Sequence, residues 1–441
     1  MQITETVAEG LKREFKVTIP SQAIAAQVDK RLGELSRTLR LPGFRPGKVP
    51  MTLVKQRYEA SVMGEVLDKL LQDSTAKVVA DNQLRPAMQP KVEVTKFEAG
   101  GDLEYTMALE QLPEVEPMDF STLELERPTV EVTDAQLDES LQRLAKRQAA
   151  TQAEAVERAA EAGDIVVIDF KGSVDGAEDE RLSSQGQSVE VGSGDFLGGA
   201  DKELVGAAAG DTRTLTWTLP DTYPEEDKRG KEASFAVTVK EVRAPKAVAI
   251  DDELAKSIGA ESLEQLKGFI RDSMARDYGR IARTKLKRVL FDKLAAEHGF
   301  SVPQTMVDAE FEQIWSRWQQ EAKASGEQEK DEETAKAEFR AIAERRVRLG
   351  LLLAEVGRRE NIQVSRDELT RAVFTEAEKY PGQERMVIEF YRKNPQMVEN
   401  LRAPLFEDKV VDHIIGKAKV TDRPVSEADL LKEDEEEGAL A

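Results

Sequence analysis

Basic and aromatic residues surround a loop near the amino terminus and could bind an anionic partner. Residues 41–50 read LPGFRPGKVP, which predicts a stiff, exposed loop between two helices. No acidic residue occurs from Leu35 to Tyr58, whereas the same stretch contains Arg37, Arg40, Arg45, Lys48, Lys55 and Arg57. A projecting Phe44 beside arginines suits both RNA phosphate and an acidic protein surface. The alternative is a tight turn with Phe44 folded back on its helices, and the residues alone leave both readings open.

Residues that usually carry covalent or metal chemistry are scarce. There is no cysteine, which excludes disulfides, thiolate nucleophiles and cysteine–zinc sites. The two histidines, His298 and His413, lie far apart in helical stretches. That separation argues against a metal or Ser–His site, although carboxylate chemistry stays open. We therefore expect no metal and no cofactor.

Charge and hydropathy limit the partners. The 441 residues include 63 basic and 84 acidic side chains, and the formal net charge is −21. General nucleic-acid binding is excluded at that charge, and only a local basic patch could bind phosphate. The amino-terminal MQITETVAEG is acidic with no apolar run, so no signal peptide is expected. Apolar clusters such as Leu349 to Ala354 are too short to span a bilayer. A cytoplasmic protein without a membrane partner is expected.

Residues 1–115 predict a small α+β domain that would hold the basic loop. Strands are expected at 14–19, 92–97 and 103–109. One helix opens at Pro20-Ser21, and its apolar residues recur at three- and four-residue steps: Ile24, Val28, Leu32, Leu35 and Leu39. A second carries Met63, Leu67, Leu70, Leu71 and Val78. Helices packed on a small antiparallel sheet are the expected arrangement.

The rest of the chain divides by composition. Residues 116–160 predict a linker broken by prolines, in which a Thr133/Gln136 capping box begins a polar helix. Residues 161–243 predict a β domain, since apolar and polar residues alternate along its strands, as in Leu215–Leu219.

Helices are expected throughout residues 244–421, with capping boxes at Ser262/Gln265 and Ser365/Glu368. Residues 422–441 predict an acidic, disordered tail. The fold class is multidomain α+β: an amino-terminal α+β domain, an antiparallel β domain with a short helix, and an all-α carboxy-terminal domain.

The pattern Gly-Phe-Arg-x-Gly-x-x-Pro in residues 43–50 resembles the ribosome-docking signature of the trigger factor family, and it lies in the expected place between two helices. The order and size of the domains match as well. The resemblance implies docking on the large ribosomal subunit near the peptide exit, on ribosomal protein and rRNA. The residues implied to do this are Gly43, Phe44, Arg45, Pro46, Gly47, Lys48 and Pro50.

The β domain resembles FKBP-type peptidyl-prolyl isomerases in residues 164–174 (DIVVIDFKGSV), 192–197 and 235–242. Such enzymes need no nucleophile: the barrier to X-Pro rotation, roughly 18–20 kcal/mol, arises from amide resonance, and an apolar cup favours the twisted amide. The cup residues implied by the resemblance are Phe170, Phe196, Leu197, Tyr223 and Phe235. Three positions depart from the family pattern, because Asp179, Gln187 and Ala200 stand where aromatics are common. A weakened activity is therefore expected, and the alternative is a β domain kept as a peptide-binding spacer.

For the helical domain, the resemblance implies long arms around an open cradle that hold unfolded chains weakly at many points. The implied function is a ribosome-associated chaperone that binds nascent polypeptides and assists folding and export, with a link to cell division. A weak homodimer off the ribosome is a further implication.

Three other functions compete with this one. The first is a free-acting prolyl isomerase whose other domains recruit substrate, which would not need the loop at residues 43–50. The second is an envelope folding factor, disfavoured by the missing secretory signal. The third is an RNA-binding module, disfavoured by the net acidity.

Overall fold

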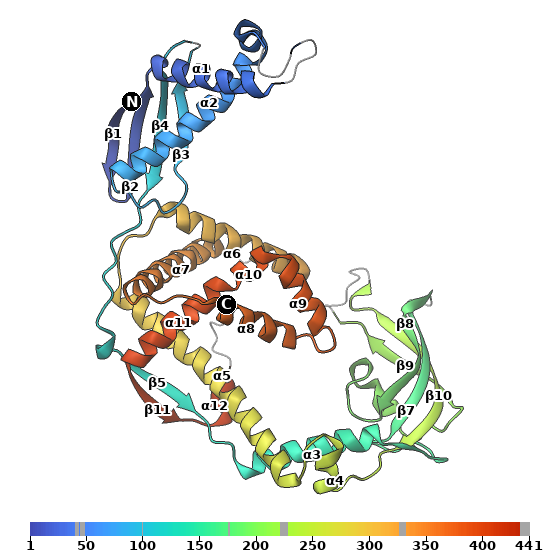
Figure 1. Ribbon diagram of the computed structural model, residues 1–441. Helices are drawn as coiled ribbons and strands as arrows, with labels where there is room; N and C mark the ends of the chain where they lie inside the picture. Colours follow the sequence, from blue (N-terminus) through green and yellow to red (C-terminus); the bar gives the residue numbers. More distant parts are fainter. Residues whose placement is uncertain are drawn as a thin grey trace. The chain divides into compact units, whose positions relative to one another are not determined.

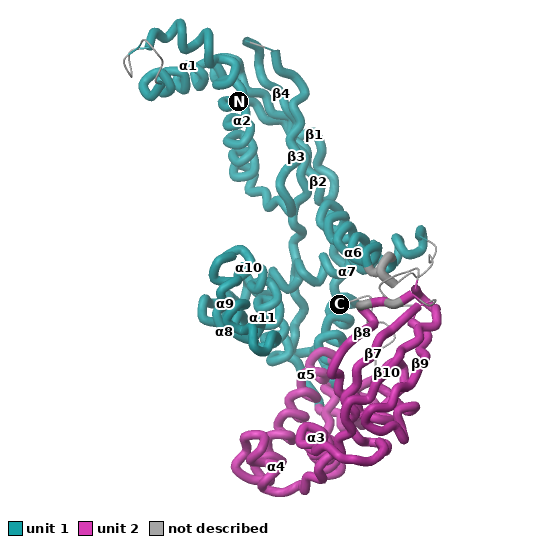
Figure 2. Tube along the Cα trace, turned by 90° about the vertical axis from the view of Figure 1, so that its right-hand side faces the viewer, with its two compact units in different colours: residues 1–126, 286–421, 433–441 teal, residues 127–285, 422–432 magenta. Residues whose placement is uncertain are grey.

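The computed structural model describes residues 1–39, 44, 49–98, 100–174, 177–220, 228–325 and 332–432. Two compact units are distinguished (Figure 2): residues 1–126 with 286–421 and 433–441, and residues 127–285 with 422–432. The predicted multidomain α+β fold class is confirmed, with the element order drawn in Figure 1.

The first unit begins with a four-stranded antiparallel sheet in the order β1-β2-β4-β3. Its strands are β1 (Gln2–Glu9), β2 (Lys12–Ile19), β3 (Lys91–Lys96) and β4 (Leu103–Glu110). Helices α1 (Ser21–Thr38) and α2 (Met51–Asp81) lie across one face (Figure 1). The predicted apolar stripe is buried, since Ile24, Val28 and Leu32 pack with the inward residues of β2 and β4. Strand β1 was not predicted, because seven of its eight residues are exposed and show no apolar alternation.

Helices form the remainder of the first unit. They are α6 (Gln304–Ser325), α7 (Glu332–Arg359), α8 (Arg366–Glu378), α9 (Glu384–Lys393), α10 (Pro395–Asn400), α11 (Arg402–Lys417) and the end of α5 (Leu263–Glu297). The capping box at Ser365/Glu368 is formed as predicted. The box at Ser262/Gln265 is only half formed: Ser262 Oγ accepts from the Gln265 N–H, but Gln265 Oε1 accepts from the Glu261 N–H instead.

The predicted linker, residues 116–160, is corrected by the structure, because its first part belongs to the helical core. Phe120, Leu123 and Leu125 are buried against apolar side chains of α5, α7 and α11. The short helix η1 (Phe120–Thr122) and strand β5 (Glu124–Thr129) lie here. Strand β5 pairs with β11 (Lys419–Pro424), and the Lys419 N–H donates to Leu123 O at 2.8 Å. The prolines interrupt helix formation without preventing this burial.

The second unit contains α3 (Asp134–Thr151), α4 (Asp252–Ser257), the first part of α5 and α12 (Glu427–Leu431). The Thr133/Gln136 capping box is formed. The predicted disordered tail, residues 422–441, is wrong for 422–432: Leu430 is buried against Tyr278 and Ala282. The Tyr278 hydroxyl donates to Glu427 Oε1 at 2.7 Å. Residues 433–441 lie outside the described part of the chain.

The β domain of this unit has five strands: β6 (Glu154–Ala155), β7 (Ile165–Val174), β8 (Ala177–Glu190), β9 (Thr212–Thr218) and β10 (Glu232–Ala244). The order is β6-β10-β7-β8, and β9 also pairs with β10. The short helix η2 (Leu197–Leu204) packs against the sheet. The sheet begins earlier than the predicted residue 161, since β6 pairs with the end of β10 and Ala160 is in the core.

Candidate functional site

Three phenylalanine side chains meet on one face of the β domain. Phe170 comes from β7, Phe235 from β10, and Phe196 directly precedes η2. The rings of Phe170 and Phe196 meet edge to face with centroids 5.4 Å apart, and those of Phe170 and Phe235 do so at 6.0 Å. Phe235 is fully buried, whereas Phe170 and Phe196 are partly exposed. The three rings form one continuous apolar wall with Phe235 at its base.

A tight left-handed turn carries Leu197 beside this wall. Leu197 has φ 47°, and it is followed by Gly198 at 64° and Gly199 at 98°. A side chain at Gly198 would place its Cβ only 2.5 Å from Trp217 Nε1, so glycine is required there by both backbone conformation and space. Leu197 is partly buried against the core of the domain. The turn therefore presents Leu197 and Phe196 as neighbours.

Trp217 is a further aromatic residue of the site that was not predicted as a cup member. Its ring lies 6.5 Å from that of Phe235 at an angle of 44°. The alternation of Leu215, Trp217 and Leu219 contained the signal, because Leu215 and Leu219 are buried and residues two apart share a face.

Asp179, one of the three departures from the family pattern, lies on β8 and on the same face of the sheet as Gly172. It pairs with Gly172, whose added Cβ would be 3.0 Å from the Phe235 ring, and residues directly opposite in antiparallel strands share a face. Lys228 Nζ donates to Asp179 Oδ2 at 2.6 Å. This bond and the Arg181 N–H hold the pKa of Asp179 below its ordinary value. The carboxylate is thus ionised and compensated rather than isolated in an apolar wall.

The remaining predicted positions differ in burial, and one lies outside the described residues. Ala200 is buried in the core, and Gln187 is exposed opposite Ile168 on strand β8. Tyr223 lies outside the described residues. Phe170, Phe196, Leu197 and Phe235 therefore come together, with Trp217 added. Among the described residues, the arrangement offers a partly exposed apolar surface on this face of the β domain.

The second candidate site is the loop between α1 and α2. Phe44 is 41% exposed, and Pro50 directly precedes α2. Gly43, Arg45, Pro46, Gly47 and Lys48 lie outside the described residues. Of the flanking cations, Lys55 pairs with Asp29 at 2.6 Å, while Arg37 and Arg57 are exposed. The loop is thus bordered by exposed guanidinium groups.

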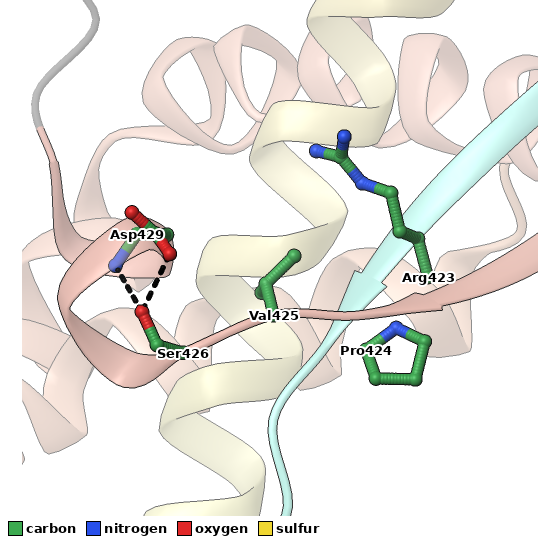
Figure 3. Close-up of a pocket in the computed structure, with 5 residues that line it drawn as sticks. All are labelled: Arg423, Pro424, Val425, Ser426 and Asp429. Carbon is green, nitrogen blue, oxygen red and sulfur yellow. Dashed lines mark hydrogen bonds between the residues drawn. The ribbon is translucent and has the colours of Figure 1, made fainter.

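One cavity elsewhere does not carry a site. It has a volume of about 570 Å³ and is lined by Arg423, Pro424, Val425, Ser426 and Asp429 (Figure 3). Ser426 caps α12: its hydroxyl donates to Asp429 Oδ2 at 2.6 Å and accepts from the Asp429 N–H at 3.1 Å. These polar groups satisfy one another, so the cavity is a by-product of the cap.

The described residues contain no group of three or more histidine, aspartate and glutamate side chains placed to hold a metal ion. None of their helices combines the length and apolar character needed to cross a membrane.

Comparisons with protein families match three successive parts of the chain. Residues 1–144 match the family described as bacterial trigger factor protein, and residues 262–416 match the carboxy-terminal part of the same protein. Residues 156–240 match FKBP-type peptidyl-prolyl cis-trans isomerase. These matches disfavour a free-acting isomerase, because both flanking regions belong to the trigger factor pattern.

Whole-length relatives agree. A trigger factor of Rhodospirillum centenum is 55% identical over 442 residues, covering 99% of this chain and 98% of the relative. A trigger factor of Paramagnetospirillum magneticum is 48% identical, covering 100% of this chain and 96% of the relative. A solved chain from a study of promiscuous substrate recognition by the trigger factor chaperone superposes with a TM-score of 0.56 at 21% identity. That superposition covers 94% of this chain and 99% of the other, and it supports the fold.

Proposed function

The chain belongs to the trigger factor family, and on that premise we propose that it docks on the large ribosomal subunit beside the peptide exit through residues 43–50. As a member of the family it is a chaperone with an FKBP-type peptidyl-prolyl isomerase domain. The family acts on nascent chains at the ribosome. The contacts with ribosomal protein and rRNA are part of the proposal.

The observation that carries docking is the exposed Phe44 within an acid-free, basic stretch of a chain whose net charge is −21. An apolar ring that is 41% exposed gains by burial against a partner, and the two flanking helices carry the exposed Arg37 and Arg57. Guanidinium groups donate to phosphate or carboxylate at the same time. Gly43, Arg45, Pro46, Gly47, Lys48 and Pro50 are assigned to the same surface.

The isomerase activity is assigned to the apolar cup. Its residues are Phe170, Phe196, Leu197, Tyr223 and Phe235, together with Trp217. The edge-to-face contacts of Phe170 support the assignment, since they join the three phenylalanine rings into one apolar wall. Such a wall favours the twisted prolyl amide, which is less charge-separated than the planar one. Asp179, already paired with Lys228, leaves one side of the cup polar. That polar side is the reason we expect a modest rate.

Client holding is assigned to the helical residues 244–421. Exposed apolar side chains on and around α8, α9 and α10 support this assignment: Phe374, Tyr380, Met386, Phe390 and Met397. Helix α9 buries none of its ten residues, although it carries several apolar ones. Many weak contacts of this kind hold an unfolded chain through avidity. A cytoplasmic location and a weak homodimer off the ribosome complete the proposal.

The docking proposal is tested by cosedimentation with large ribosomal subunits. Replacing Phe44, Arg45 and Pro46 together by alanine is expected to abolish binding while the circular dichroism spectrum stays unchanged. Lys91→Ala is the matched control, because it also removes one positive charge from the same domain, on the exposed strand β3. Each neutralised phosphate contributes about 0.7–0.9 to the slope of log affinity against log salt. Undiminished binding by the triple variant refutes the assignment.

A further inference from the structure

The segment that presents Phe196 to the cup has an unusual backbone. Gly192 and Gly194 have φ of 80° and 87°, and the left-handed run from Leu197 to Gly199 follows a few residues later. Leu197 lacks the freedom of glycine, so its positive φ costs conformational energy that the surroundings must offset. The position of Phe196 therefore depends on the interactions that stabilise this segment at its two ends.

One hold is steric. Gly198 lies so close to the Trp217 indole that no Cβ would fit, which fixes the end of the segment against β9. The second interaction is a hydrogen bond, in which Asp201 Oδ2 accepts from the Gly194 N–H at 2.9 Å. Asp201 therefore reaches back across seven residues to the start of the same segment.

Asp201 is conspicuous because none of its surface is exposed. Its neighbours Ala200 and Leu204 are part of the apolar core. Its second oxygen, Oδ1, is buried and has no hydrogen-bond partner among the described residues. Aspartate is almost never fully buried unless it is paired, and a carboxylate bound by one neutral N–H is costly to place there. An amide or hydroxyl side chain would supply the same acceptor at lower cost.

We propose that Asp201 is a positioning residue for prolyl isomerisation, because its hydrogen bond to Gly194 fixes the segment that sets Phe196 against Phe170. Asp201 does not touch the substrate. It acts through the backbone of residues 194–196, so that the apolar wall is complete before the peptide arrives. This rests on the cup proposed above.

The test compares Asp201→Ala, Asp201→Asn and a control, Val242→Ala. Val242 is a buried residue of the same core, at the far end of β10, so its substitution lowers stability without touching the segment. Exchange of a leucyl-prolyl peptide is followed by NMR in the full chain, and urea unfolding is measured alongside. Asp201→Ala is expected to lose roughly tenfold in kcat/KM, the equivalent of one hydrogen bond. Asp201→Asn keeps an acceptor and is expected to restore most of the rate.

Two results overturn the proposal. One is a wild-type rate in Asp201→Ala. The other is an equal loss of rate in Val242→Ala, which would make the effect one of stability alone. The Gly194 amide proton gives a readout independent of catalysis: it is expected to shift upfield in Asp201→Ala and to stay unchanged in the control. A background rate in the wild type would refute the cup, whereas an unshifted Gly194 amide would refute the positioning role separately.

Discussion

The wall of the cup predicts measurable coupling between Phe170 and Phe196. Their rings meet edge to face at 5.4 Å, with an interplanar angle of 72°. Such a pair contributes about 0.5–1.5 kcal/mol beyond its buried area. Leucine is the chosen substitute because it keeps apolar volume and limits the cavity that alanine would leave. Phe170 also meets Phe235, so Phe170→Leu should cost about 1–3 kcal/mol in aromatic contacts, twice the cost of Phe196→Leu.

The assay is a double-mutant cycle read in both unfolding free energy and isomerase rate. Either substitution alone already breaks the ring pair. The double variant should therefore lose less unfolding free energy than the two single variants lose together, and the difference should be about 0.5–1.5 kcal/mol. In rate this corresponds to about twofold to twelvefold. The matching cycle of Phe196→Leu with Val242→Ala should be additive, since Val242 lies seven residues from Phe235, roughly 23 Å along the strand. Additivity of Phe170 and Phe196 in both measurements would refute the wall as a functional unit.

Three further outcomes are expected. Removing residues 154–244, which includes β6, should leave most suppression of client aggregation intact; a folded deletion variant that no longer delays aggregation would contradict this. Asp179→Phe combined with Lys228→Met should raise the isomerase rate several-fold, because the polar side of the cup becomes apolar, and an NMR exchange rate no higher than wild type would contradict it. Hydrogen bonds from Arg358 and Arg359 lower the pKa of Glu355 to about 2, so its stabilisation is present above about pH 4.5 and is lost as pH falls toward 2. The measurement is urea unfolding, followed by helical ellipticity at a series of pH values. The unfolding free energy of the wild type should fall with this loss, and that of Glu355→Gln should depend less on pH.

Local signals in the sequence predicted local structure well. Short spacing made the capping boxes predictable: those at Thr133/Gln136 and Ser365/Glu368 form with both reciprocal bonds, and the one at Ser262/Gln265 forms one of the two. The apolar stripe of α1 is buried for the same reason: helical periodicity is a short-range property. The aromatic members of the cup were available only through family resemblance, since they come from three separate elements.

Long-range pairing was not visible in the sequence. The sequence predicts a linker where strand β5 lies, because its partner, β11, comes almost three hundred residues later and neither strand has an apolar face of its own. Likewise, Asp179 was recognised as a departure from the family pattern, but its salt bridge with Lys228 depends on how β8 approaches the segment that precedes β10. Buried Asp201 gave no signal at all, because a single aspartate beside glycines is an ordinary feature of surface turns.

The packing of residues 115–125 constrains how this chain is itself made. Their apolar side chains are completed by Val410, Val411 and Ile414, which are among the last residues of the helical core to be translated. Translation proceeds at roughly 5–20 residues per second, so these partners are synthesised on the order of 15–60 s after the segment. The amino-terminal sheet and the β domain have their own cores and need no such delay. During its own synthesis, therefore, this chaperone exposes unfinished apolar surface of the kind that its family binds in other nascent chains, until its last helices have been translated.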